Sequence, residues 1–191
     1  GSLWAWGWGM LGNGNSSVTP SFEPIVISNQ IDWHKIYNSS WDITLALKMD
    51  STLWGWGFNS DGQMMFDNSY QLVPFQLDNN KWISISSSWG SVFGIKADGT
   101  LWRWGDNWPN GIITSPIQVG TESNWKLVNN AYSSISLIQT NGSLWLTEWA
   151  PGEVFSPQQF GSDMNWEDTY VNGWSGGFYG LKTNGQLIYL S

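Results

Sequence analysis

Short apolar stretches alternate along this chain with segments rich in serine, asparagine and glycine. One stretch recurs, as Leu-Trp-Ala-Trp-Gly at Leu3–Gly7, Leu-Trp-Gly-Trp-Gly at Leu53–Gly57 and Leu-Trp-Arg-Trp-Gly at Leu101–Gly105. Weaker copies begin at Leu144 and Leu187, so the leading leucines are 50, 48, 43 and 43 residues apart. A period in this range is typical of repeat architectures, in which each unit buries its faces against its neighbours.

A turn signal precedes the recurring stretch. Asp98-Gly99, Asn141-Gly142 and Asn184-Gly185 each lie between an apolar run ending in Lys or Gln and the run that begins with leucine. Such a dipeptide between apolar runs predicts a β-hairpin with a type I′ turn, in which both turn residues have positive φ. Asp50-Ser51 takes the same place in an earlier repeat, and its serine predicts strain or another turn type.

Two further signals recur between the hairpins. A proline precedes a short apolar run, and we expect it to open a strand, where its missing N–H does least harm. A lone tryptophan follows eight or nine residues later, and then comes a polar, turn-like stretch such as Ser86-Ser87-Ser88. The prolines are Pro24, Pro74, Pro116 and Pro157, and the lone tryptophans are Trp33, Trp82, Trp125 and Trp166.

The Leu-Trp-x-Trp-Gly strand is apolar on both faces, because Leu53 points one way while Trp54 and Trp56 point the other. A sheet that is wet on one side alternates apolar with polar positions, whereas sheets covered on both faces do not. Short strands, Gly and Pro turns and two buried faces predict an all-β fold, a β-propeller of 43–50-residue repeats. A two-layer sandwich gives no reason for a fixed repeat.

The order of these parts resembles bacterial members of the regulator of chromosome condensation repeat family. Leu45–Lys48, Trp56–Gln63 and Asp98–Trp102 carry the match, which extends over the whole chain. The resemblance implies propeller blades of four antiparallel strands, set in a closed ring and acting in protein–protein contacts.

We expect a single repeat domain over residues 1–191, with repeats at about 1–52, 53–100, 101–143 and 144–191. It holds four hairpin units and an orphan N-terminal strand at Leu3–Gly7, because the strand that should precede this one is not in the sequence. An unpaired apolar edge favours aggregation. The sequence therefore predicts either self-association or a larger propeller with further blades upstream.

Composition narrows the choice of partners. Fifteen acidic against seven basic residues give a net charge of −8, which argues against nucleic acid or an anionic membrane. No cysteine is present, so disulfides and thiolate chemistry are excluded, and no apolar run is long enough to insert in a membrane. The few lysines and the many Trp, Asn and Ser residues suggest an extracytoplasmic, secreted or surface-associated protein.

Aromatic residues stand at one repeat position where the family pattern has glycine. Trp41, Trp89 and Tyr132 lie seven residues before the Lys or Gln that ends the strand, and Trp174 lies eight residues before Lys182. Matching loops of neighbouring blades open on one end of a propeller, so we expect the four side chains to form an arc. Trp and Tyr amid Ser, Asn and Gly are typical of recognition loops, whereas the alternative is that they plug the blade ends as core.

A second column follows the recurring strand, with Trp8, Phe58, Asp106 and Trp149 at matching places and Trp108 nearby. We treat its aromatic members as secondary candidates for partner contact, although a place just beyond a buried strand also suits core packing. The remaining repeat tryptophans are predicted to form the core, namely Trp4, Trp6, Trp54, Trp56, Trp102, Trp104 and Trp145, with Trp33, Trp82, Trp125 and Trp166.

Catalytic and metal-binding patterns are missing from the sequence. His34 is the only histidine, and Glu167 and Asp168 are adjacent, so they point apart on a strand. Asn59–Gly62 lacks the later bidentate glutamate of a calcium loop, and we expect a turn there. We therefore expect no catalytic residue, no metal and no cofactor.

These observations favour a non-enzymatic propeller that binds a protein partner through loop aromatics on one face. A carbohydrate-binding propeller is the alternative, since tryptophan faces flanked by Asn and Asp also suit sugar rings. An exchange factor for a small GTPase is third, because it is the role that named the family.

Overall fold

The computed structural model describes residues 1–16, 20–38, 43–107, 110–148, 154–172 and 177–190. These residues form strands and no helix. Neighbouring strands pair antiparallel throughout, in the order in which they occur along the chain.

Three sheets have four strands each. The first holds β3 (Trp33–Asn38), β4 (Ile43–Lys48), β5 (Leu53–Phe58) and β6 (Tyr70–Gln76). The second holds β7 (Trp82–Ser88), β8 (Ser91–Lys96), β9 (Leu101–Asp106) and β10 (Ile112–Val119). The third holds β11 (Trp125–Ala131), β12 (Ser134–Gln139), β13 (Leu144–Glu148) and β14 (Gln158–Gln159).

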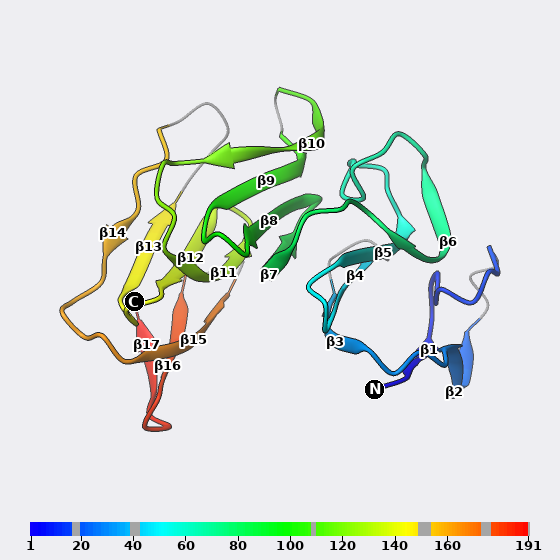
Figure 1. Ribbon diagram of the computed structural model, residues 1–191, viewed down its shortest axis with the longest axis horizontal. Helices are drawn as coiled ribbons and strands as arrows, with labels where there is room; N and C mark the ends of the chain where they lie inside the picture. Colours follow the sequence, from blue (N-terminus) through cyan, green and yellow to red (C-terminus); the bar gives the residue numbers. More distant parts are fainter. Residues whose placement is uncertain (17–19, 39–42, 108–109, 149–153, 173–176, 191) are drawn as a thin grey trace.

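Shorter sheets lie at the two ends. The last is a three-stranded sheet of β15 (Trp166–Val171), β16 (Phe178–Lys182) and β17 (Leu187–Leu190), and at the other end β1 (Leu3–Gly7) pairs with β2 (Ser21–Ser28). Figure 1 shows the sheets in an open arc, with β3, β7 and β11 toward its middle and β6, β10 and β14 outside. The predicted all-β propeller of four-stranded blades is thus confirmed, with an N-terminal strand pair.

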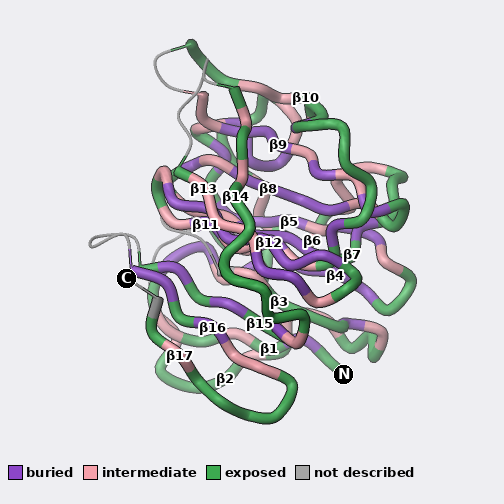
Figure 2. Tube along the Cα trace, turned by 90° about the vertical axis from the view of Figure 1, so that its left-hand side faces the viewer, coloured by how far each residue is buried: buried purple, intermediate pink, exposed green. Residues whose placement is uncertain are grey.

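Each four-stranded sheet begins at a lone tryptophan, so it spans a boundary between two of the repeats expected from the sequence. The core lies between successive sheets. Trp82 and Trp104 of the second sheet are in one buried cluster with Leu45 and Leu53 of the first. Figure 2 accordingly shows buried backbone along β4, β5, β8, β9 and β12, whereas β14 on the outside is exposed.

The tryptophans of β1 depart from the predicted core. Trp4 and Trp6 are 48% and 64% exposed, whereas Trp56 and Trp104, at the place of Trp6 in the next two blades, are 3% and 0% exposed. Trp56 is covered because it packs with Leu3 and other residues of the neighbouring unit. The prediction was wrong for Trp4 and Trp6, because no sheet of the described chain covers the corresponding side of β1.

The Asx turns also differ from the prediction. Of each dipeptide only the second residue has positive φ, as at Gly99 and at Ser51, whose φ is 67°. The turn is longer than type I′, because Lys96 N–H donates to the Thr100 carbonyl at 3.0 Å. The Asp98 carboxylate accepts the backbone N–H of Thr100 at 3.0 Å and its hydroxyl at 2.6 Å. An Asx side chain that bonds the backbone two residues on stabilises such a turn without positive φ at the Asx itself.

This turn also fixes the first tryptophan of the recurring strand. The Thr100 hydroxyl accepts the indole N–H of Trp102 at 2.7 Å, and the Lys96 ammonium lies 3.5 Å from the centre of a Trp102 ring. The same indole-to-hydroxyl bond joins Trp54 to Thr52. The segment Asp-x-Thr-Leu-Trp therefore recurs because its polar groups are hydrogen-bonded in sequence. The Asp carboxylate accepts from Thr, and the Thr hydroxyl accepts from the Trp indole.

The polar stretch Ser86–Ser88 that follows Trp82 is strand, not turn. Ser84, Ser86 and Ser88 lie on β7. Their hydroxyls accept the backbone N–H groups of Val128 and Asn130 on β11 at 3.2 and 2.9 Å, and that of Tyr132 just after β11 at 3.3 Å. The predicted turn was wrong because the serines have a structural role on the strand. The adjacent inner strands β7 and β11 are not paired through their backbones. Short hydroxyl side chains bridge them instead.

Three of the four prolines do not open their strands. Pro24, Pro74 and Pro116 lie inside β2, β6 and β10, which are outermost strands with a register shift close to each proline. A proline is tolerated there because an edge strand or a bulge does not need its N–H. Pro157 directly precedes β14.

Candidate partner-binding surface

One end of the arc gathers the turns between first and second strands and the loops that follow third strands. The pairing of Ser91 with Gly105 and of Ser134 with Glu148 brings these two sets of segments side by side. We call this end the aromatic face. The opposite end carries the Asx turns and is called the Asx-turn end.

The turn after β7 places a tryptophan at the tip of the aromatic face. Trp89 and Gly90 have φ values of 49° and 80°, and they form a two-residue turn between the paired Ser88 and Ser91. This is the type I′ pattern, which usually holds Asn or Gly at its first position. A bulky residue at positive φ is an outlier that costs on the order of 1–2 kcal/mol. Tyr132, in the corresponding turn of the next blade, also has a positive φ, 56°.

The two strained aromatics meet on this surface. Trp89 is 47% exposed and Tyr132 is 66% exposed. Their ring centroids lie 6.1 Å apart at an angle of 81°, an edge-to-face contact. The Ser88 hydroxyl, which accepts the Tyr132 N–H, ties the two turns together. The pair forms a corner of two nearly perpendicular rings that is open to solvent.

The other candidates fall into two groups. Trp41, Trp174, Trp108 and Trp149 lie outside the described residues. Trp8 and Phe58 are described, and both are exposed. Of the four primary candidates the structure therefore places two, which it brings together on one end of the arc, and partner contact by all of them remains a prediction.

The loop after β5 extends the aromatic face between two blades. The Asn59 side chain holds this loop by donating to the carbonyls of Phe66 and Asn68 and accepting the Met64 N–H, all within 2.8 Å. The Gln63 carbonyl then accepts the Trp104 indole N–H of the next blade at 2.7 Å. Asn59–Gly62 is thus part of a structural loop, as expected.

Three acidic residues lie on chain segments next to the turns of the aromatic pair. Asp61 approaches the turn so closely that a Cβ on Gly90 would come within 2.6 Å of its carboxylate. The Asp106 N–H donates to the Gly90 carbonyl at 3.0 Å, and Glu148 lies beside the Tyr132 turn through its pairing with Ser134. The sequence analysis named Asp106 in the second column and Asp61 within the Asn59–Gly62 turn, but it predicted partner contact for neither, and it did not single out Glu148.

The basic residues are distributed unequally between the aromatic face and the Asx-turn end. Arg103 is the basic residue nearest the aromatic face, but it is buried and donates to the Asp106 carbonyl at 3.1 Å and to Asn107 Oδ1 at 2.8 Å. Burial lowers the pKa of Arg103, and the Asp106 charge opposes that shift. The lysines lie at the Asx-turn end or on the strand halves nearest it, at positions 35, 48, 81, 96, 126 and 182.

The described residues contain no group of three or more His, Asp or Glu side chains placed to hold a metal ion. His34 is exposed on β3 near the Asx-turn end, away from the aromatic pair. In the parts of the chain that the structure describes, no helix is long and apolar enough to cross a membrane.

No family model matches the sequence, and no curated protein sequence does. Solved structures do match. Human WBSCR16 is 14% identical with a TM-score of 0.74, over 95% of this chain and 54% of that one. Prp20p from Saccharomyces cerevisiae, described with its binding to Gsp1p and histones, is 17% identical with a TM-score of 0.71, over 98% and 52%. The computationally designed Ika4 protein is 12% identical with a TM-score of 0.53, over 85% and 92%.

Prp20 is the yeast RCC1, so the chain has the propeller fold of RCC1-repeat proteins, and the resemblance seen in the sequence is confirmed for the fold. At these identities the likeness shows the fold alone. The chain spans about half the length of WBSCR16 and Prp20p.

Proposed function

We propose that the chain is a protein-binding propeller that contacts its partner with the aromatic face. The observation that carries the proposal is the pair of exposed aromatics, Trp89 and Tyr132, both held at positive φ. Backbone strain of this kind persists where the surrounding structure enforces it, and it concentrates at functional sites. A turn that served only to link two strands would be more stable with Asn or Gly.

The acidic residues near the aromatic pair favour a partner with basic side chains. The aromatic pair lies among Asp61, Asp106 and Glu148, while the lysines lie toward the other end. An anionic rim around aromatic rings favours lysine or arginine side chains, which gain both ion pairing and cation–π contact. We therefore propose a partner segment that carries basic residues beside apolar ones. RCC1-fold proteins whose binding is described, such as Prp20p with Gsp1p and histones, also take protein partners.

The test is a selection of ligands by the full chain from a displayed library of random peptides, followed by affinity measurements on the selected sequences. We expect basic peptides to be enriched and their affinity to fall as salt is raised, because exposed charges are screened. Trp89→Ala and Tyr132→Ala should each weaken binding by about 30-fold, the effect of about 2 kcal/mol at a hot spot.

Phe75→Ala is the matched control, since Phe75 is 49% exposed on the outer strand β6 and lies off the aromatic face. Equal losses in the control and in the Trp89 variant would contradict the proposal. So would enrichment of acidic peptides. A glycan array tested in parallel decides the alternative: glycan binding that depends on Trp89, without peptide binding, would make the propeller a lectin. The extracytoplasmic location also remains a proposal from composition.

A further inference from the structure

A groove runs along the free edge of β1. This strand pairs with β2 on one side only, and no described residue pairs with its other edge. In the three four-stranded sheets the equivalent strand, β5, β9 or β13, pairs on both sides. The free edge therefore presents unpaired backbone groups that can accept another strand.

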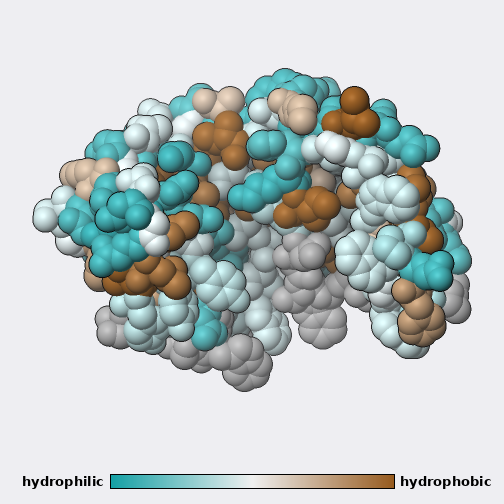
Figure 3. All heavy atoms as spheres, turned by 90° about the horizontal axis from the view of Figure 1, so that it is seen from below, coloured by the Kyte–Doolittle hydropathy of each residue, from teal (hydrophilic) through white to brown (hydrophobic). Residues whose placement is uncertain are grey.

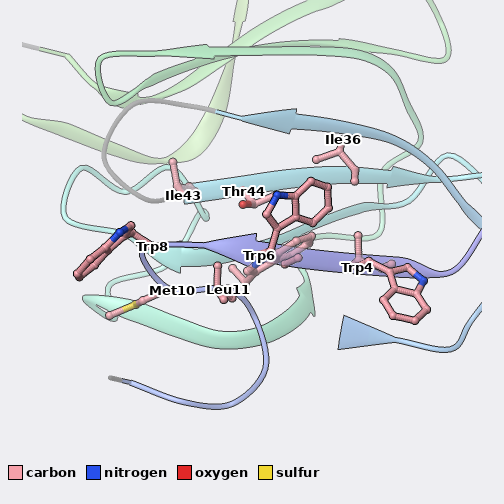
Figure 4. Close-up of a pocket in the computed structure, with 11 residues that line it drawn as sticks. Trp4, Trp6, Trp8, Met10, Leu11, Ile36, Ile43 and Thr44 are labelled. Carbon is pink, nitrogen blue, oxygen red and sulfur yellow. The ribbon is translucent and has the colours of Figure 1, made fainter. Parts of the chain in front are cut away.

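Apolar side chains line this groove, which has a volume of about 500 Å³. They come from β1 and the segment after it, and from β3, β4 and β5 of the facing sheet. In Figure 4 the indole of Trp6 stands between β1 and β4, beside Thr44 and near Ile36, and Trp8 lies at the end toward Ile43. Figure 3, viewed from the open side of the arc, shows apolar side chains exposed among polar ones.

The other blades show what normally covers such a surface. Ile36 is 48% exposed, whereas Ile85, at the same place on β7, is 1% exposed because it packs in the core between the first and second sheets. Val128 on β11 is equally buried. The groove thus corresponds to the space that a first and a second strand fill in every four-stranded blade.

We propose that the groove binds a β-hairpin of this repeat type, whose second strand pairs antiparallel with β1. The internal copies define its chemistry. Ala46 faces Trp54 and Gly94 faces Trp102, whereas Leu137 faces Trp145 in the third sheet. A hairpin patterned on the first two sheets therefore places a small residue opposite Trp4. A Cβ on Gly94 would come within 2.7 Å of the Trp82 ring, which shows that the small residue makes room for the lone tryptophan of the hairpin's first strand.

A lysine at the end of the second strand completes the pattern. Lys48 lies 4.3 Å from the centre of a Trp54 ring and Lys96 lies 3.5 Å from that of a Trp102 ring. Trp4 holds the same place on β1, and its indole N–H already donates to the Ser2 hydroxyl at 2.9 Å, as Trp102 does to Thr100. The incoming hairpin is therefore expected to end its second strand in a lysine that stacks on Trp4. This site is separate from the aromatic pair and does not depend on the function proposed for it.

The test uses the full chain and a synthetic peptide with the sequence of residues Trp82–Lys96, which forms the β7–β8 hairpin here and supplies both the glycine and the lysine. Calorimetric titration should give saturable one-to-one binding. Ile36→Lys should weaken it at least tenfold, because a charge would enter an apolar groove. A peptide with alanine for its final lysine should bind about two- to fivefold more weakly, the effect of an exposed cation–π contact.

Ile83→Lys is the matched control. Ile83 is 43% exposed, lies outside the groove, and stands where β11 has Lys126, so it should leave the affinity unchanged. Trp6→Ser gives a second groove variant, and thermal melts verify that all three proteins are folded. Absence of binding at millimolar peptide, or equal losses in the groove and control variants, would overturn the proposal. A dimer of the chain alone, abolished by Ile36→Lys in sedimentation, would also overturn it by making a second copy the occupant.

Discussion

Trp89 holds a backbone angle that suits asparagine or glycine better than tryptophan. Trp89→Asn should leave the free energy of unfolding within about 1 kcal/mol of the parent, because relief of strain offsets loss of the edge-to-face contact with Tyr132. Urea unfolding measures this change. Trp104→Ala is the contrasting variant, since Trp104 is fully buried and its truncation should cost about 3–5 kcal/mol. A loss above about 2 kcal/mol in Trp89→Asn would show that the aromatic is there for packing.

Tyr37 gives the molecule a pH dependence in the alkaline range. Burial raises the pKa of its hydroxyl from 10.0 to about 12, so the fold favours the neutral phenol. The stability that this group contributes is complete below pH 10 and is lost as the pH rises through about 12. Tyr37→Phe should therefore lose less stability than the parent between pH 9 and pH 12, as followed by urea unfolding across that range. Parallel losses in the two proteins would contradict the assignment.

At the scale of elements, serine hydroxyls join the inner strands of neighbouring blades. Ser86→Ala should destabilise the protein by about 1–3 kcal/mol, because the buried Asn130 N–H would lose its acceptor. Ser16→Ala, in an exposed loop, is the control and should change little. Thermal unfolding compares them. If both variants melted together with the parent, the bridges between β7 and β11 would contribute no net stability.

Some of the strands and their burial could be predicted from the sequence, and others could not. The hairpins, the blade class and the burial of Trp82, Trp104 and Trp125 follow from hydrophobic pattern and period, which depend only on local chain geometry. The strand at Ser86–Ser88 could not be predicted from this pattern, because three consecutive serines are typical of a loop. Their place on a strand is explained only by the hydrogen bonds that they accept from the neighbouring blade. The strand-opening role given to the prolines fails for a similar reason, since edge position and bulges are properties of the assembled sheet.

Part of the candidate surface could be predicted and part could not. The repeat position of Trp89 and Tyr132 placed them in corresponding turns, because equal spacing from a buried strand fixes their end of the blade. The approach of Asp61 to Gly90 could not be read in advance, since it depends on how the Asn59 loop folds.

At the scale of the whole molecule, stability is expected to vary along the arc. The second strands β4, β8 and β12 are paired on both sides and buried, whereas β1 and β17 each have one partner strand in the described structure. Amide hydrogen exchange should therefore be slowest in β8 and β12 and fastest in β1 and β17, because local opening is governed by buried contacts. Mass spectrometry of peptic fragments measures it. Equal protection of β1 and β8 would argue that the β1 edge is already covered in solution.

The separation of lysines from aromatics has a practical consequence for handling the molecule. Primary amines lie toward one end, and the exposed ones include Lys81 and Lys126 there, while the N-terminal amine bonds the Ile31 carbonyl on the same side. Amine-directed coupling to a sensor chip or biotin tag will therefore hold the protein by its Asx-turn end. The immobilised layer will share one orientation, with Trp89 and Tyr132 directed toward the flowing sample.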